Sequence, residues 1–371
     1  MDLVYVRWVW CRALLHRGWW LVTSVYLVAD AHLSAAQLVL IGVGQSVVAL
    51  VFEVPAGVVA DAYSRRWSLV VSHVLMGAAM LTTGLVTGFL SLVATQMLWG
   101  LSWTFASGAD VAWISDELHD PASVPPVLLR AERAQLTGTV AGLAGLGGLA
   151  WLIGRGPAMV LAGAAMTLLG LYVAVRFQEH RFVPARRRSI LRQGLRHSRT
   201  LLPVFAATML VNGAGDAFGR LYPLRLLGLA PAADPVLWFT ALGIVMCLVG
   251  AAALRLVQPR IAGPATVRRG YVTACLVAVA GAAGLTVAPD PVTASLAVLL
   301  AAGAFPLTRA FATLWVNSAT PSAVRATVHS LLAQTSYVGS ITCGLLVATA
   351  GLPACAALLT AAAVIVLATR R

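Results

Sequence analysis

Apolar segments of about 20 residues recur along the whole chain, separated by short polar gaps. At 1.5 Å per residue, a helix of that length crosses the roughly 30 Å hydrocarbon core of a membrane. Twelve such segments are predicted: Val9–Ala29, Leu38–Val59, Leu69–Gly88, Leu92–Ile114, Leu136–Leu152, Ala158–Val175, Leu201–Leu226, Val236–Val257, Val272–Ala288, Thr293–Val316, Val324–Ala348 and Pro353–Ala368. The pattern therefore predicts an all-α integral membrane protein with twelve transmembrane helices.

The gaps between these segments alternate in their arginine content. One set carries Arg65 and Arg66, Arg130 and Arg133, the run from Arg176 to Arg199, the run from Arg255 to Arg269, Arg325, and Arg370 with Arg371. The other set carries Asp30 and His32, residues 89–91, Arg155, Asp234 and Asp290. Because arginine-bearing loops stay in the cytoplasm, the division predicts that both termini are cytoplasmic. An even number of crossings satisfies that prediction.

The first apolar segment has a second interpretation. Arg7, Arg12 and Arg17 precede the apolar run 18–28 and a small-residue site at 29–31, which is the layout of a cleavable signal peptide. Cleavage would leave eleven spans. If the segment is retained, its inner half carries Arg12, His16 and Arg17, which suits a helix that lines a water-filled cavity.

The composition excludes most soluble classes. Hydrophobic residues make up 60% of the chain and charged residues 11%, against about 25% charged in ordinary globular domains. The net charge of +13 would fit nucleic acid, but its 26 basic residues are all arginines that lie mostly between apolar segments. The five cysteines have no C-x-x-C spacing, and the histidines form no metal motif. We expect no enzyme activity, no cofactor, no metal and no nucleic-acid partner.

A tight polar turn joins the second and third apolar segments. It carries Gly57, Asp61, Arg65 and Arg66. This spacing resembles the loop between helices 2 and 3 of transporters of the major facilitator superfamily, with departures at Ala62 and Ser64. The resemblance implies two six-helix bundles, residues 1–176 and 201–371, joined by the arginine-rich cytoplasmic linker 177–200. It also implies a monomer.

The end of the fourth segment carries a second motif. Ser107-Gly108-Ala109, Ala112-Trp113-Ile114 and Asp116-Glu117 resemble the signature of a bacterial, drug-efflux-like branch of the same superfamily. The Glu53-Val54-Pro55 sequence and Thr327 resemble that branch as well. Leu118-His119-Asp120 departs from it, because a glycine usually follows the acidic pair.

The resemblance also implies a gate. In the family, the aspartate of the loop sits against the start of helix 11 and closes the cytoplasmic side. Carried over, Asp61 would meet the amides near residues 322–324, with Arg325 close by. Helix dipoles favour such a contact by about 0.3–2 kcal/mol, enough to shift a two-state equilibrium several-fold.

Charged residues inside the apolar segments are functional candidates, because a charge at the bilayer centre costs about 2.5–3.5 kcal/mol or more. Asp216 lies near the middle of the seventh segment and can pair with Arg220 at i+4. That pair is either self-neutralising or a proton-coupling carboxylate. Arg309 is predicted to pair with Glu53 or Asp110, or to bind an anionic substrate.

Aromatic and glycine residues complete the candidates. Trp20, Tyr26, Trp103 and Trp113 belong to helices 1 and 4, which line the cavity in this family. Five glycines, at 138, 142, 145, 147 and 148, predict close helix packing by the fifth segment.

The sequence thus predicts a secondary active transporter of a bacterial cytoplasmic membrane. The preferred form is proton-coupled efflux, by antiport, of a small hydrophobic or amphipathic compound. A metabolite uptake permease and a non-transporting sensor or scaffold remain alternatives. The expected partners are the small-molecule substrate, protons and the lipid bilayer.

Overall fold

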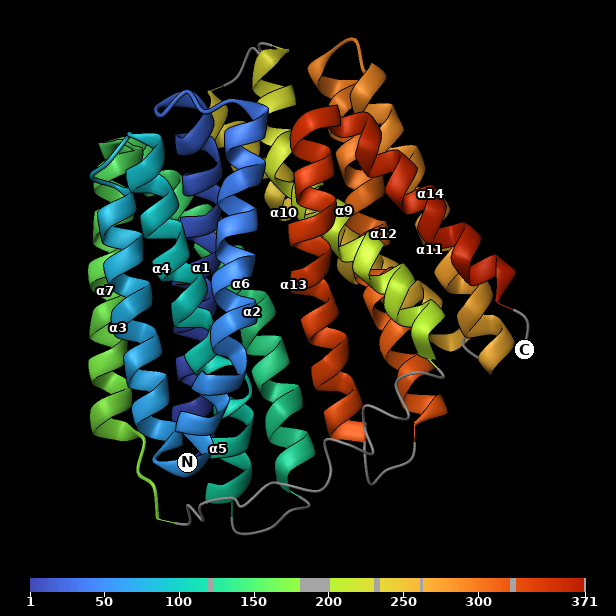
Figure 1. Ribbon diagram of the computed structural model, residues 1–371. Coiled ribbons are helices and arrows are strands. Elements are labelled where there is room, and N and C mark those ends of the chain that lie inside the picture. Colours follow the sequence, from blue (N-terminus) through green and yellow to red (C-terminus); the bar gives the residue numbers. More distant parts are fainter. Residues whose placement is uncertain (119–122, 181–200, 230–233, 261–262, 321–324, 370–371) are drawn as a thin grey trace. The chain divides into compact units, whose positions relative to one another are not determined.

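A computed structural model describes residues 1–118, 123–180, 201–229, 234–260, 263–320 and 325–369 (Figure 1). Its elements are α1 Asp2–Ala29, α2 Ala35–Ala62, α3 Arg65–Thr83, α4 Phe89–Ala106, α5 Ala109–Glu117, α6 Val124–Ile153, α7 Arg155–Arg176, α9 Leu202–Gly228, α10 Pro235–Val257, the 3₁₀ turn η3 Gln258–Arg260, α11 Pro264–Val287, α12 Pro291–Ala319, α13 Arg325–Ala350 and α14 Leu352–Ala368. All regular structure in this part of the chain is helical, so the all-α prediction is confirmed there.

Eight of the described helical segments are long and apolar enough to cross a membrane. They are α2, α4 taken together with α5, α6, α7, α10, α11, α12 and α13. The chain is therefore a multi-pass membrane protein. The count of twelve crossings and the cytoplasmic location of both termini stay predictions.

Two helices begin well before the predicted apolar spans. α6 begins at Val124 rather than Leu136, and α11 begins at Pro264 rather than Val272. Their first turns contain polar residues that a hydropathy pattern assigns to the gap. A helix keeps its backbone hydrogen bonds beyond the apolar portion, so hydropathy marks the membrane-crossing part rather than the helix.

The fourth predicted span is two helices. α4 ends at Ala106, and α5 starts at Ala109 after Gly108, whose φ is +74°. Glycine adopts this left-handed backbone readily because it has no Cβ atom. The break separates the tryptophans of α4 from the acidic residues of α5.

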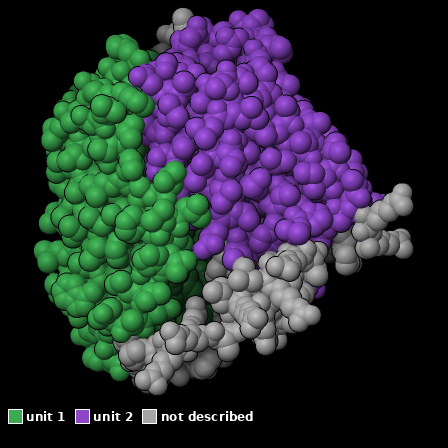
Figure 2. All heavy atoms as spheres, in the orientation of Figure 1, with its two compact units in different colours: residues 1–33, 47–186, 233–244 green, residues 34–46, 187–232, 245–371 purple. Residues whose placement is uncertain are grey.

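The described chain forms two compact units (Figure 2). Unit 1 comprises residues 1–33, 47–186 and 233–244, and unit 2 comprises residues 34–46, 187–232 and 245–371. The first turns of α2 thus belong to unit 2, and those of α10 belong to unit 1. The predicted division at 176 and 201 stays a prediction, because most of its linker, 181–200, lies outside the described residues.

Each unit contains a helix crossing at which glycines bring two backbones into direct contact. In unit 1, a Cβ on Gly142 of α6 would lie 2.1 Å from the carbonyl oxygen of Leu14 of α1. In unit 2, a Cβ on Gly339 of α13 would lie 2.1 Å from the carbonyl oxygen of Met209 of α9. These backbones touch directly, as small residues allow in membranes. The predicted close packing by the glycines of the fifth segment is present at Gly142.

Candidate functional site

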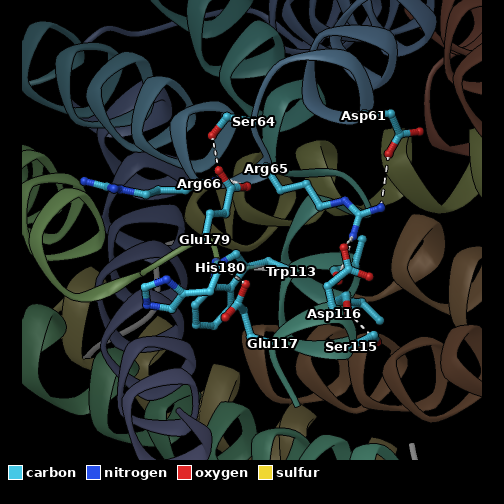
Figure 3. A network of polar contacts seen from close by, with 12 residues as sticks. Asp61, Ser64, Arg65, Arg66, Trp113, Ser115, Asp116, Glu117, Glu179 and His180 are labelled. Carbon is cyan, nitrogen blue, oxygen red and sulfur yellow. Dashed lines mark hydrogen bonds and ion pairs between the residues drawn. The ribbon is translucent and has the colours of Figure 1, made fainter. Parts of the chain in front are cut away.

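The turn between α2 and α3 is fixed by hydrogen bonds to its own backbone and to a distant carboxylate (Figure 3). Ser64 caps α3 by accepting a 3.0 Å bond from the Trp67 amide. Its hydroxyl donates to Glu179 Oε2 at 2.5 Å, and the Arg66 amide donates to Glu179 Oε1 at 3.0 Å. A carboxylate at a helix N-terminus also complements the helix dipole. Glu179 therefore anchors the segment after α7 to the start of α3.

The two arginines of the turn reach different helices. Arg65 forms ion pairs with Asp61 of α2, at 3.6 Å between Nη2 and Oδ1, and with Asp116 of α5. It also donates to the Ala112 carbonyl at 3.0 Å. Arg66 donates to the Ala174 carbonyl of α7. The arginine pair thus ties the end of α2, α5 and α7 to the start of α3.

The acidic end of α5 completes this network. Glu117 is 5% exposed and accepts a 2.8 Å bond from the His180 amide. Trp113 stacks on Phe177 with 4.0 Å between ring centroids and donates to the Gln178 carbonyl at 3.2 Å. Trp113 therefore lies in buried packing beside the network. We call Asp61, Ser64, Arg65, Arg66, Asp116, Glu117 and Glu179 the turn cluster.

The structure gives fewer contacts for the other two predicted gate residues, Gly57 and Arg325. Among the described residues, no atom comes within 4 Å of a Cβ built on Gly57. Arg325 is the first residue of α13. Its predicted neighbours 322–324 lie outside the described residues, so the contact of Asp61 with this helix start stays a prediction.

Three predicted or neighbouring charged groups in the helices of unit 1, Arg12, Asp110 and Glu53, have partners within that unit. Arg12 of α1 lies 3.5 Å from Asp110 of α5, between Nη1 and Oδ2. Its guanidinium also lies over the Trp103 ring, 5.2 Å from the centroid. Glu53 accepts a 2.6 Å bond from the Ser107 hydroxyl. Arg17 of α1 is exposed.

Arg309 lies on α12 of unit 2, whereas its two predicted partners belong to unit 1. Pairing of Arg309 with Glu53 or Asp110 therefore stays a prediction.

Aromatic rings from α1 and α4 form a continuous stack that includes two of the predicted cavity residues. His16 stacks on Trp99 with 5.4 Å between centroids and 13° between planes. Trp99 contacts Trp20 at 5.4 Å and Trp103 at 6.0 Å. In the part of the chain that the structure describes, His16 Nε2 and Trp99 Nε1 are buried without a hydrogen bond. We call His16, Trp20, Trp99 and Trp103 the aromatic face.

Tyr26 lies apart from the aromatic face. It is 6% exposed, and its hydroxyl donates to the Val86 carbonyl at 3.1 Å in the connection between α3 and α4. Tyr26 thus holds a loop in place.

The main ionic contact within the helices of unit 2 is the pair on α9. Arg220 lies 3.2 Å from Asp216 between Nε and Oδ2, and 3.3 Å between Nη2 and Oδ1. It donates a further bond to Gln45 Oε1 of α2 at 2.5 Å. The Arg220 side chain is 8% exposed and that of Asp216 is 33% exposed. The arginine is thus shared between a carboxylate of its own helix and an amide of α2.

Sequence reasoning missed three contributors to these arrangements. Glu179 stands out only as a single acid beside the arginine-rich linker, and Gln45 only as an amide within an apolar run. His16 stands out only as a polar residue in the inner half of the first apolar segment, and its aromatic neighbours do not follow from the sequence. The signal for all three is a polar side chain whose surroundings in the sequence are apolar or of opposite charge. Their partners lie far away in sequence, so the sequence does not identify them.

Comparisons with known proteins address the fold. No protein-family model matches the chain, and no curated protein matches it. Among solved structures, it is similar to the nucleoside transporter NupG, with 13% identity, a TM-score of 0.76, and coverage of 99% of this chain and 97% of that chain. It is also similar to a bacterial homolog of the human lysosomal transporter Spinster, with 16% identity, a TM-score of 0.73 and coverage of 99% and 95%.

A D-xylose–proton symporter gives a similar result, with 13% identity, a TM-score of 0.72 and coverage of 99% and 97%. At such low identity these similarities concern architecture. The chain therefore shares its overall fold with these solved transporters.

Proposed function

We propose that this protein is a secondary active transporter that works by alternating access and exports a small hydrophobic or amphipathic compound in exchange for protons. Its place would be the cytoplasmic membrane of a bacterium, and it would act as a monomer of two six-helix bundles. The fold shared with solved transporters supports the transport part. The drug-efflux-like motif around Trp113 supports the direction.

The observation that carries proton coupling is the shared arginine of α9. A carboxylate inside an apolar helix is retained in membrane proteins mainly where it has a task. Protonation of Asp216 would weaken its two contacts with Arg220 and leave the contact of Arg220 with Gln45 in place. Gln45 lies on α2 and Asp216 on α9. Protonation of Asp216 would therefore weaken the contact of Arg220 within α9 relative to its contact with α2.

The aromatic face is the proposed contact surface for the substrate. Stacked indole and imidazole rings offer flat apolar area, and aromatic pairs gain about 0.5–1.5 kcal/mol beyond area burial. Trp103 is 37% exposed, so its ring is the part of this surface that a substrate would meet first. Such a surface fits planar or amphipathic molecules better than sugars.

The turn cluster is the proposed conformational element. It joins α2, α3, α5 and the segment after α7, so these parts would move together. Asp61 would add the contact to α13 in one state and lose it in the other. A differential contact of this kind is what a two-state transporter requires.

The test is transport of a compound panel in proteoliposomes, with and without an imposed pH gradient. Asp216→Asn is expected to abolish acceleration by the gradient, because an amide cannot release a proton. Asp290→Asn is the matched control, since Asp290 caps α12 from the exposed loop and an asparagine caps equally well. Gradient-driven transport that survives in Asp216→Asn would refute the coupling role.

Uptake is the second candidate, because the similar structures include a D-xylose–proton symporter. The direction of flux along an imposed proton gradient separates export from uptake. A scaffold that moves no solute would show no flux for any compound, and it would tolerate the double variant Asp61→Asn/Asp216→Asn in any cellular assay of its role.

A further inference from the structure

Unit 2 contains a groove of about 650 Å³ between α10, α11 and α12, and neither Asp216 nor Arg220 is among its lining residues. Its volume falls in the usual range of about 300–1,000 Å³ for small-molecule sites. The walls are almost wholly apolar. Leu296 and Leu300 of α12, which line it, are 58% and 49% exposed, so this groove opens on the outer surface of these helices.

Two glycines open the groove along its length. Gly303 leaves room between α12 and α10, since a Cβ there would lie 3.2 Å from Val249 Cγ1. Gly270 leaves room for the ring of Phe311, which lies directly over it. From Arg269 to Val277 the wall formed by α11 spans nine residues, which is about 12 Å at a rise of 1.5 Å for each of eight steps. The space is therefore elongated along the helix axes.

Cationic groups lie at one end of this space. Arg260 closes η3 after α10, and Arg269 lies in the first turns of α11. Both are exposed, and Thr266 lies beside them in the lining. None of the residues that line the groove is acidic, and no ion pair in the described part of the chain involves either arginine. The polar end thus carries two positive charges.

We propose that this groove binds one anionic phospholipid of the surrounding membrane, with the phosphate on Arg260 and Arg269 and an acyl chain along α10, α11 and α12. The arginines belong to a gap that the positive-inside rule assigns to the cytoplasm, so the lipid comes from the inner leaflet, which is where basic residues attract anionic headgroups. A soluble anion would use the arginines alone and leave the apolar length unfilled.

The test is native mass spectrometry of the purified full-length protein titrated with long-chain phosphatidylglycerol. The variant Arg260→Gln/Arg269→Gln removes the headgroup contacts. The matched control is Arg176→Gln/Arg255→Gln, which removes the same net charge from exposed positions outside the groove lining. The first bound lipid is expected to weaken about fivefold for each groove arginine lost, and to bind normally to the control.

A second variant tests the chain contact. Ala253→Phe fills the apolar part of the groove and keeps both arginines. It is expected to weaken long-chain phosphatidylglycerol and to leave a short-chain analogue unaffected, with folding checked by thermal unfolding of the same samples.

Four outcomes would overturn the proposal. Equal losses in the two double variants would mean general attraction of charges, and unchanged binding in the groove variant would mean another site. Insensitivity to Ala253→Phe would mean that the headgroup alone binds. Displacement of the lipid by a transported compound would make the groove a substrate site. None of these results depends on whether the protein transports by proton exchange.

Discussion

The glycine crossings of the two units are nearly the same, although their polar residues differ. On α1 of unit 1, Leu14 and Gly18 face Gly142, and Cβ atoms at the two glycines would lie 2.1 and 2.3 Å from backbone oxygens. On α9 of unit 2, Met209 and Gly213 face Gly339 with the same two distances. Leu14 and Gly18 on α1 are four residues apart, and so are Met209 and Gly213 on α9. Backbone packing in the membrane thus repeats where sequence similarity between the halves is faint.

The charged groups do not repeat. Unit 1 has the turn cluster, where Arg65 joins Asp61 and Asp116, and a separate pair of Arg12 with Asp110. Unit 2 holds Asp216 and Arg220 in the middle of α9. The connection between α10 and α11 offers no counterpart of Asp61 in sequence. Close helix packing by small residues is therefore common to both units. The two units differ in the placement of their polar residues.

The largest expected effect would come from breaking the shared crossing. Gly142→Leu and Gly339→Leu each force a side chain into an opposing backbone, and overpacking of this kind costs about 3 kcal/mol. Both should lower the thermal unfolding midpoint in detergent by similar amounts. Gly148→Ala on α6 is the control, because no described atom lies within 4 Å of a Cβ there. A large difference between the two leucine variants would mean that the crossings are not equivalent.

The next effect would come from the charge pair of unit 2. Arg220→Gln leaves Asp216 without its ionic partner in an apolar helix, and breaking such a pair costs about 2 kcal/mol after allowing for the partial exposure of the carboxylate. The additional variant Asp216→Asn should recover most of the lost stability, because it removes the stranded charge. Failure of that rescue in thermal unfolding would show that Arg220 stabilises α9 through Gln45 instead.

A smaller effect is expected at the turn cluster. Arg65→Gln removes ion pairs whose carboxylates, Asp61 and Asp116, are as exposed as Asp216 but lie near helix ends rather than in the middle of an apolar helix. We expect water to screen these pairs, so the loss is about 1 kcal/mol. The same change at Arg176, an exposed residue at the end of α7, should have no measurable effect. If Arg65→Gln destabilised the protein as much as Arg220→Gln, the contrast between an exposed and a membrane-embedded cluster would be wrong.

The smallest effect concerns the caps of two helices, α4 in unit 1 and α12 in unit 2. The N-cap of α4 is Gly88, which offers no side chain, whereas the N-cap of α12 is Asp290. Hydrogen bonds from the backbone and hydroxyl of Thr293, and from the Val292 amide, lower the pKa of Asp290. A lowered folded pKa adds stability above the unfolded value of about 3.9, and that stability is lost as pH falls through the folded value.

Asp290→Asn keeps the cap but cannot titrate. The difference in unfolding midpoint between wild type and this variant should therefore be constant near neutral pH and change only below about pH 4. A change between pH 6 and 8 would have to come from another group.

The helices could be predicted because lipid imposes their length and apolar character. Their ends could not, since α6 and α11 continue through arginine-bearing turns. The contact of Arg220 with Asp216 follows from i,i+4 spacing on one helix face of α9. Asp61 and Arg65 are also four residues apart, but they meet across the turn between α2 and α3. The contacts of Glu179 with Ser64 and of Gln45 with Arg220 join segments more than a hundred residues apart, and no local pattern encodes them.

Gly108 has a consequence for how one predicted crossing behaves. Any other residue at its left-handed backbone would add strain of about 1–2 kcal/mol, so the elbow between α4 and α5 depends on a single missing methyl group. On the C-terminal side of the elbow, α5 is joined to α3 by the ion pair of Asp116 with Arg65. On the N-terminal side, α4 presents its tryptophans to α1. The predicted fourth crossing is thereby divided into two helices, and the direction in which the acidic residues of α5 leave the tryptophans of α4 depends on this one glycine.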